Sequence, residues 1–314
     1  MRVVVPPIKS QGIKTKLVPW IQAIVPDVTG RWIEPFLGTG VVAFNSGFKR
    51  ALLGDTNPHL IRFYQQVQRG IIGPSRVRRY LEHEGQSLCA AGNDGYDYFT
   101  KVKNRFNESQ DPLDFLFLSR AGFNGMMRFN KKGYWNIPFC KKPERFSKSY
   151  ITKIVNQVHD VACLIQPEWE FWTAPFEEII LEATENDIIY CDPPYAGRYV
   201  DYYNGWTDED EERLFRLLSS TPAKFILSTW HHNDYRENEM VARYWNHFNI
   251  VTRDHFYHSG AKIENRRSIV EALVFNFEAN IESHNHGVQP RPEQLMLFEE
   301  RAKYITEQLS RADV

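Results

Sequence analysis

Cysteine pairs, long apolar runs and a sizeable net charge are all absent from this chain of 314 residues. The cysteines show no CxxC or Cys/His spacing, which argues against a zinc site and a disulfide framework; they are Cys89, Cys140, Cys163 and Cys191. No apolar run approaches the roughly 18 residues that span a bilayer, and the opening MRVVVPPIKSQG lacks the apolar core of a signal peptide. We therefore expect a cytosolic protein with reduced cysteines and no membrane partner.

Metal ligands are also sparse. His231 and His232 are adjacent, but no acidic residue stands at ligand spacing from them, so we expect two surface histidines and no metal site. The 42% of hydrophobic and 14% of aromatic residues are typical of a globular chain and argue against disorder.

The net charge of -1 hides an uneven distribution. Between residues 120 and 148 the only acid is Glu144, against eight basic residues: Arg120, Arg128, Lys131, Lys132, Lys141, Lys142, Arg145 and Lys148. A basic segment in a neutral chain is typical of a polyanion-binding surface, because each phosphate that it neutralises releases counterions. Charge alone equally allows an ordinary solvated surface.

Strand and helix patterns alternate along much of the chain. Residues 31–56 read as strand, glycine turn, helix and strand, and short apolar runs at 187–191, 224–228 and 269–277 predict further strands. The segment 207–219 predicts a helix with Thr207 as N-cap and a buried face at Leu214, Phe215, Leu217 and Leu218. These elements predict an α/β fold with a doubly wound sheet.

The alternation stops between residues 69 and 167, where helical patches at 96–106 and 112–120 accompany the basic segment. We therefore predict a main domain of residues 1–68 and 168–279 and an inserted, mainly helical lobe of residues 69–167. Residues 280–314 predict a proline-bearing linker and a C-terminal helix.

A glycine loop follows the first predicted strand. Gly38 and Gly40 fit G-x-G-x-x-A, and Asp55 stands at the end of the next strand, an arrangement that suits a dinucleotide or another adenosine cofactor whose ribose bonds an acid. The same glycines also suit a turn that only packs strand against helix. Glu34 and the aromatic Phe36 favour a cationic amino-acid moiety over a pyrophosphate.

The tetrapeptide Asp192-Pro193-Pro194-Tyr195 is a stronger signal, because it follows the strand 187–191 directly and so lies at a carboxyl end where α/β sheets bind ligands. An adenine amine is a poor nucleophile, since its lone pair is delocalised into the ring. A carboxylate and a proline-fixed carbonyl can both accept its N–H bonds and so favour the pyramidal nitrogen that forms during alkylation. Tyr195 offers a face on which a base can stack.

Together, EPFLGTG at 34–40 and DPPY at 192–195 resemble the Dam-type (alpha-group) adenine-specific DNA methyltransferases. That family has a Rossmann-like sheet and places its target-recognition region between these motifs, which is the order found here. Four more segments are similar to family motifs: PIKSQGIK at 7–14, LGDTNPHL at 53–60, AGFNGMMRFNKKGYWNIP at 121–138 and RRSIVEALVFNF at 266–277. Pro175 stands where the family has an acid before an aromatic residue.

The resemblance implies site-specific methyl transfer from S-adenosylmethionine to the 6-amino group of a flipped-out adenine in double-stranded DNA, in the bacterial cytosol. It implies a catalytic tetrapeptide formed by Asp192, Pro193, Pro194 and Tyr195. Its implied cofactor contacts are Lys14, Glu34, Phe36, Gly38, Gly40, Asp55, Phe176 and Asp192. Its implied DNA contacts are Lys9, Phe123, Asn124, Met126, Arg128 and Pro138. From their charge, we expect Lys131, Lys132, Lys141 and Lys142 to bind phosphates and so to position the DNA without reading its sequence. Tyr202, Tyr203 and Trp206 either line the base pocket or pack within their own loop.

Several alternatives remain open at this level. A nicotinamide oxidoreductase would use the glycine loop but leaves the tetrapeptide and basic segment unexplained, and a non-catalytic DNA-binding regulator would not need the acids. RNA or a free nucleotide presents the same amine. The chain either partners a cognate restriction endonuclease or acts alone, and a GATC-like target is the first hypothesis. Gln294 to Phe298 (QLMLF) resembles a peptide that docks on a replication sliding clamp, or it belongs to the apolar face of the C-terminal helix.

Overall fold

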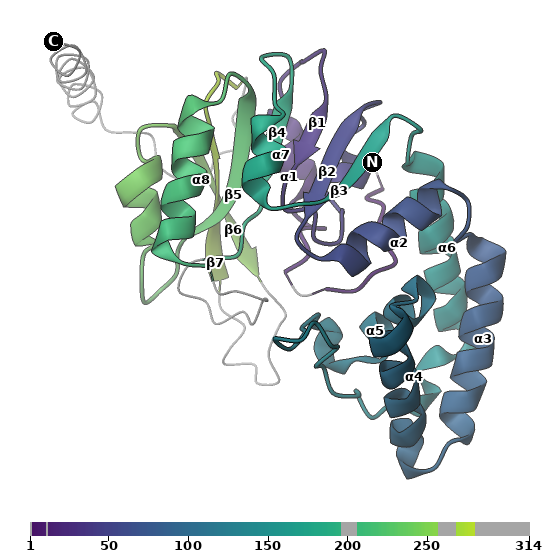
Figure 1. The fold of residues 1–314 in the computed structure, drawn as a ribbon. Helices are drawn as coiled ribbons and strands as arrows, with labels where there is room; N and C mark the ends of the chain where they lie inside the picture. Colours follow the sequence, from purple (N-terminus) through teal and green to yellow (C-terminus); the bar gives the residue numbers. More distant parts are fainter. Residues whose placement is uncertain (1, 11, 196–205, 257–267, 280–314) are drawn as a thin grey trace, which may run out of the picture.

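A mixed seven-stranded sheet lies at the centre of the part that the structure describes, residues 2–10, 12–195, 206–256 and 268–279 of a computed structural model (Figure 1). Its strand order is β3-β2-β1-β4-β5-β7-β6. The strands are β1 (Trp32–Glu34), β2 (Ala51–Asp55), β3 (Trp169–Thr173), β4 (Ile188–Cys191), β5 (Lys224–His232), β6 (Asn249–Phe256) and β7 (Ser268–Phe275).

Strands β1 to β5 pair in parallel, and β7 runs antiparallel between β5 and β6. Successive residues of a central strand face opposite layers of core: Trp32 packs with Tyr190 on one side of the sheet, and Ile33 packs with Ile189 on the other. Strands buried on both faces read as unbroken apolar runs, which is why IIYC was recognisable in the sequence. The predicted α/β doubly wound sheet is confirmed.

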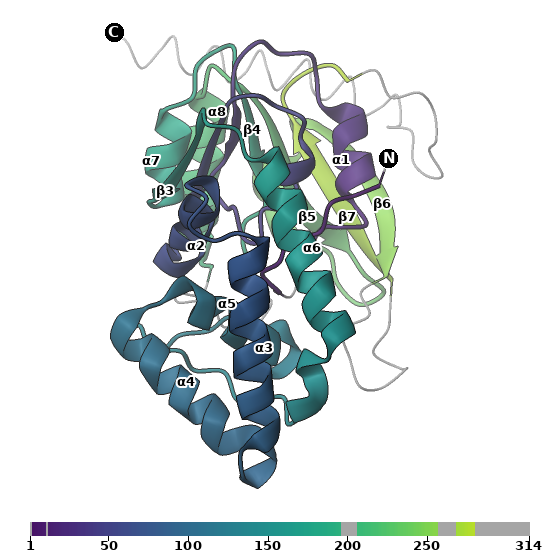
Figure 2. The same cartoon turned by 90° about the vertical axis from the view of Figure 1, so that its right-hand side faces the viewer.

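Helices cover both faces, with α1 on one side and α7 and α8 on the other (Figure 2). The helices are α1 (Val18–Ile24), α2 (Pro58–Gln68), α3 (Pro74–Ala90), α4 (Tyr96–Ser109), α5 (Pro112–Ala121), α6 (Lys148–Leu164), α7 (Phe176–Leu181) and α8 (Asp208–Ser220). Short 3₁₀ helices are η1 (Ala43–Asn45), η2 (Asn93–Gly95), η3 (Phe123–Gly125) and η4 (Pro143–Phe146), and η5 (Val241–Trp245) is a short π-helix.

The helix predicted directly after the glycine loop is wrong in extent, because only the single turn η1 forms there. The side chain of Asn45 donates to the Val41 carbonyl and forms two further bonds with the backbone of Val4, each at 2.7–2.9 Å. Gly47 then adopts a positive φ of 79°. These contacts hold the segment in a non-helical path, since Asn and Gly favour caps and turns over helix interiors.

Thr207 is the N-cap of α8, as predicted, and forms a capping box with Asp210. Leu214 and Leu218 are buried, whereas Phe215 and Leu217 are partly exposed. The buried carboxylate of Glu211 was not expected; it accepts hydrogen bonds from the indoles of Trp206 and Trp245 at 2.6 and 2.7 Å.

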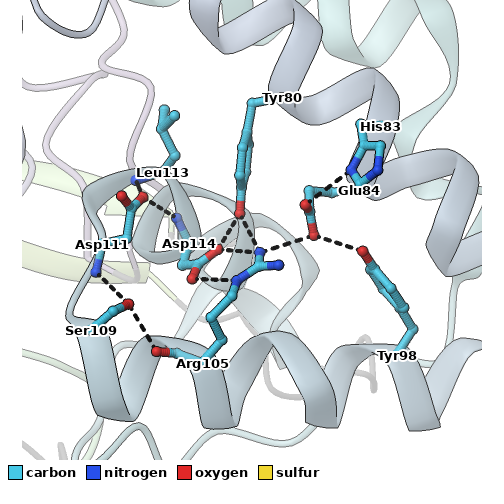
Figure 3. A network of polar contacts seen from close by, with 9 residues as sticks. All are labelled: Tyr80, His83, Glu84, Tyr98, Arg105, Ser109, Asp111, Leu113 and Asp114. Atoms are coloured by element: carbon cyan, nitrogen blue, oxygen red, sulfur yellow. Dashed lines mark hydrogen bonds and ion pairs between the residues drawn. The ribbon is translucent and has the colours of Figure 1, made fainter.

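Helices α3, α4, α5 and α6 stand together beside the sheet (Figure 1). Every residue of α5 is buried, as expected of a helix that is apolar on nearly all sides. Its buried acid Asp114 accepts from the Arg105 guanidinium at 2.8 Å and from the Tyr80 hydroxyl. Arg105 also bonds the buried Glu84 at 3.1 Å (Figure 3), so one cation joins α3, α4 and α5.

The linker and C-terminal helix predicted at residues 280–314, including Gln294 to Phe298, lie outside the described residues. Within the described residues, no helix is long and apolar enough to cross a membrane.

Candidate active site

The two strands that carry the motifs end side by side where the winding of the sheet reverses. The chain runs from β1 outward to β2 and β3, whereas β4 and β5 lie on the other side of β1. Because β1 and β4 are parallel neighbours, Glu34 and Asp192 leave the sheet at the same edge. Open α/β sheets bind ligands at this kind of switch point.

Three carboxylates gather at this edge. Glu34 is 2% exposed and accepts a hydrogen bond from Trp32 Nε1 at 2.9 Å. Burial raises the pKa of Glu34 well above its usual range, and the neighbouring carboxylates of Asp192 and Asp55 raise it further. A ligand that brings positive charge would relieve this repulsion.

Asp55 ends β2 and is fixed by the backbone. Its two carboxylate oxygens accept from the N–H groups of Gly38 at 2.9 Å and Asn57 at 2.8 Å. Burial raises the pKa of Asp55 to about 6, although both hydrogen bonds oppose the shift. The group therefore titrates just below neutral pH.

The glycine loop needs its glycines for two separate reasons. Gly38 and Gly40 have positive φ values of 51° and 77°, which favour glycine. A Cβ on Gly40 would also lie 2.5 Å from the Phe44 ring. Phe36 and Gly38 remain partly exposed, whereas Leu37, Thr39 and Gly40 are buried. Phe36 and Gly38 are therefore the accessible residues of the loop at the carboxyl ends of the strands.

An aromatic cluster lies beside the loop. The rings of Phe36 and Phe176 stack with centroids 5.3 Å apart, and Trp206 lies 5.6 Å from each. Trp206 therefore packs with the predicted cofactor contacts, while Tyr202 and Tyr203 lie outside the described residues. Such flat apolar faces suit a stacked heterocycle.

A chain of polar contacts links Asp192 to Tyr195 through Lys14. Lys14 Nζ lies 2.9 Å from Asp192 Oδ1, donates to the Tyr195 hydroxyl at 2.6 Å and lies 4.5 Å from the centre of the Tyr195 ring. The Tyr195 hydroxyl in turn donates to Glu271 Oε2 at 2.5 Å. Lys14, expected at the cofactor, thus contacts the acid and the tyrosine of the predicted catalytic tetrapeptide.

Asp192 carries opposing electrostatic influences. Burial raises its pKa, the Lys14 ammonium lowers it, and the Glu271 carboxylate raises it again, so that the pKa stays above its ordinary value. Pro193 is buried and Pro194 is partly exposed directly beyond it. Their fixed φ values hold the Asp192 backbone and the intervening carbonyl rigid.

Residues 121–140 form an irregular hairpin on the helical lobe. Its buried side chains Trp135, Ile137 and Phe139 alternate with outward-facing ones, and Phe123 N donates to the Pro138 carbonyl at 2.9 Å. The predicted DNA contacts that are exposed are Phe123, Asn124, Lys131, Lys132 and Pro138; Met126 and Arg128 are partly buried.

Lys9 reaches this hairpin from the N-terminal segment. A Cβ on Gly125 would lie 2.6 Å from Lys9 Cγ, so the N-terminal segment and the hairpin are in close contact here. Asn124 beside it has a positive φ of 52°. Partial burial and the nearby Arg145 lower the pKa of Lys9. The structure therefore brings Lys9 against Gly125, the residue after Asn124, although 116 positions separate Lys9 from Gly125 in the sequence.

A family model for D12 class N6 adenine-specific DNA methyltransferases matches residues 10–287. The chain belongs to this family. It is similar to the DNA adenine methylase of Vibrio cholerae, with 32% identity over 226 residues that cover 68% of this chain and 76% of the relative. The DNA adenine methylase of Escherichia coli is 28% identical over 223 residues, or 68% and 74% of the two chains. The Type II methyltransferase M1.LlaDCHI of Lactococcus lactis is 25% identical over 288 residues, or 86% and 94%.

Two residues of this adenine-specific DNA methyltransferase have positions that the sequence did not reveal. Arg120, counted among the basic surface residues, is 5% exposed and donates to the Pro7 carbonyl and to Gln157 Oε1 at 2.6 Å each. It joins the N-terminal segment to α5 and α6 and cannot reach a phosphate. Glu271 was overlooked at the site, although a lone acid in the run IVEALVFNF could have drawn attention to it.

Proposed function

We propose that this DNA methyltransferase takes its methyl group from S-adenosylmethionine and delivers it to an adenine flipped out of duplex DNA. The observation that carries the proposal is the gathering of the Glu34, Asp55 and Asp192 carboxylates at the carboxyl ends of β1, β2 and β4. Every oxygen of Asp55 that accepts a backbone N–H keeps a lone pair for a ribose hydroxyl.

The residues fit the cofactor in charge and shape. The acids complement its cationic amino-acid portion, and Phe36 with Phe176 offers stacked faces for its adenine. Gly38 and Gly40 bring backbone close to the ligand without side chains. Lys14 assists by fixing Asp192.

When bound, the cofactor supplies an electrophilic methyl group on a sulfonium. The chain's own residues then act on the amine. Asp192 and the Pro193 carbonyl accept hydrogen bonds from its two N–H groups, which favours the pyramidal nitrogen of the transition state. Tyr195 stacks on the base. The low dielectric of the site strengthens each of these interactions.

The helical part, residues 69–167, would read the DNA, while residues 1–68 and 168–279 form the catalytic domain. Phe123, 48% exposed, would wedge into the opened stack, and Asn124 would occupy the place of the extruded base. Arg128 would contact a guanine edge, Lys9 would reach the DNA beside Gly125, and Met126 and Pro138 would support that loop. The exposed Lys131, Lys132, Lys141 and Lys142 would hold phosphates.

The relatives of this chain include both DNA adenine methylases and Type II methyltransferases. A cognate restriction endonuclease and a sliding-clamp contact through Gln294 to Phe298 therefore stay predictions for this chain.

Substitution of Asp192 tests the proposed chemistry. Asp192→Ala should abolish incorporation of labelled methyl into DNA while leaving the affinity for S-adenosylhomocysteine, measured by calorimetry, within a few-fold. Asp187→Asn is the matched control, because Asp187 is a buried acid at the opposite end of β4 that bonds Arg31. An active Asp192→Ala variant would contradict the mechanism.

A further inference from the structure

We propose that Glu271 is a positioning residue for the reaction: it holds the Tyr195 hydroxyl so that the Tyr195 ring presents a fixed face to the flipped adenine. This inference rests on the function proposed above. It assigns a role to a residue of the antiparallel strand β7 that is far in the sequence from the glycine loop and from the tetrapeptide at 192–195.

Glu271 occupies a place where an apolar side chain would fold more easily. It is 0% exposed and is followed by Ala272, Leu273 and Val274, all fully buried. In the antiparallel ladders it lies opposite Trp230 of β5 and Arg253 of β6. Burying a carboxylate is costly, and replacing buried ionic groups by apolar ones is often neutral or stabilising. An acid at this position therefore needs a reason other than packing.

The contact with Tyr195 supplies that reason. The Tyr195 hydroxyl donates to Glu271 Oε2 at 2.5 Å and accepts from Lys14 Nζ at 2.6 Å. A hydroxyl has one hydrogen to donate, so this pairing defines the direction of its O–H bond. Glu271 must act as the acceptor, a role that a glutamine oxygen can also fill and a leucine cannot.

The ring is thereby held at both ends. Pro193 and Pro194 restrict the backbone that leads into Tyr195, but they do not restrict its side-chain torsions. The hydroxyl contact restricts those torsions, and Lys14 Nζ lies 4.5 Å from the ring centre. A ring that is already ordered loses less conformational entropy when a base stacks on it. A small displacement of such a group can cost catalysis heavily.

The contacts also connect Glu271 to Asp192 through Tyr195 and Lys14. Lys14 bridges the Tyr195 hydroxyl and Asp192 Oδ1, so movement of Tyr195 would disturb the partner of the proposed catalytic acid. The expected defect of a Glu271 variant is therefore in kcat and in DNA binding, while cofactor affinity stays nearly unchanged.

A double-mutant cycle tests this role. Glu271→Leu and Tyr195→Phe should each lower kcat about tenfold, the effect of losing about one buried hydrogen bond. Glu271→Leu/Tyr195→Phe should be no worse than Tyr195→Phe alone, because both changes remove the same contact. Glu271→Gln, which keeps an acceptor, should retain kcat within about threefold. Affinity for S-adenosylhomocysteine should change less than about twofold in all variants.

Asp187→Asn, which removes another buried acid next to the sheet, controls for loss of stability. It should keep the wild-type kcat even where its melting temperature falls as far as that of Glu271→Leu. Additive losses in the double variant, or a wild-type kcat in Glu271→Leu, would overturn the role of Glu271. If Glu271→Leu does not fold, Glu271→Gln decides. A tenfold loss of kcat on this substitution that is equal in the wild-type and Tyr195→Phe backgrounds would overturn the role. Failure of the proposed function itself looks different, since the wild type would then bind no S-adenosylhomocysteine or Asp192→Ala would stay active.

Discussion

Lys14 Nζ lies 2.9 Å from Asp192 Oδ1, and Lys14 is 5% exposed. The contact joins residues 178 positions apart in the sequence and pairs a buried cation with the carboxylate proposed to act on the adenine amine. The ammonium donates hydrogen bonds to Asp192 and to Tyr195, the same two groups that would receive the target base. Lys14 therefore favours the ionised form of Asp192 before DNA binds.

Replacing Lys14 should move the pH dependence of catalysis. Burial raises the pKa of Asp192 and Lys14 lowers it, so Lys14→Met should raise that pKa further. Because the ionised carboxylate accepts the amine hydrogens, the acidic limb of the kcat profile should shift to higher pH. Methyl incorporation between pH 5 and 9 measures the shift. Lys16→Met, two residues away and exposed, is the control, and a shared shift would refute this role.

Asp55 should make cofactor binding depend on pH near neutrality. Its pKa is raised to about 6, so it loses its charge as the pH falls through 6 and accepts a ribose hydroxyl less strongly. The affinity for S-adenosylhomocysteine should decrease from pH 7.5 to 5.5. Asp55→Asn should bind S-adenosylhomocysteine weakly at both pH values. NAD, the cofactor of the alternative oxidoreductase function, should not raise the melting temperature of the wild-type protein. Unchanged pH dependence in Asp55→Asn would exclude Asp55 as its source.

Arg128 and Lys141 should separate specificity from general affinity. Arg128→Ala should cost about 1–3 kcal/mol of discrimination at one base pair, because a guanidinium can make a bidentate contact to guanine. Lys141 is exposed, and Lys141→Ala should weaken binding to all DNA sequences. It should also reduce, by about one, the slope of the logarithm of the binding constant against the logarithm of the salt concentration. Binding titrations at several salt concentrations with matched and mismatched duplexes measure both. If Arg128→Ala kept both the specificity and the affinity of the wild type, the assignment of Arg128 as a DNA contact would be wrong.

The Arg105 network should stabilise the helical lobe far more than a surface pair does. Arg105 and Arg78 are each 39% exposed, but Arg105 bonds the buried Asp114 and Glu84, whereas Arg78 bonds the exposed Glu82. Arg105→Ala leaves two buried acids without their cation and should lower the free energy of unfolding by about 3 kcal/mol. Arg78→Ala should cost about 0–1 kcal/mol. Urea unfolding of both variants compares them, and equal costs would show that burial of the partners is unimportant.

Local patterns in the sequence determined the elements that carry the chemistry. The unbroken run IIYC marks a strand buried on both faces, and it ends directly at Asp192. The Thr207 capping box and the acids after it begin α8 where the sequence predicts. These features depend on residues within one or two turns of each other, so a single stretch of chain is enough to recognise them.

Tertiary structure alone decided which distant residues meet. Lys14, Tyr195 and Glu271 come from three separate segments, and their contact depends on β7 inserting between β5 and β6. Arg120 reads as one more surface cation, yet the path of the N-terminal segment buries it against Pro7. Strand order and the close packing of segments far apart in the chain set these contacts, and neither leaves a periodic signal in the sequence.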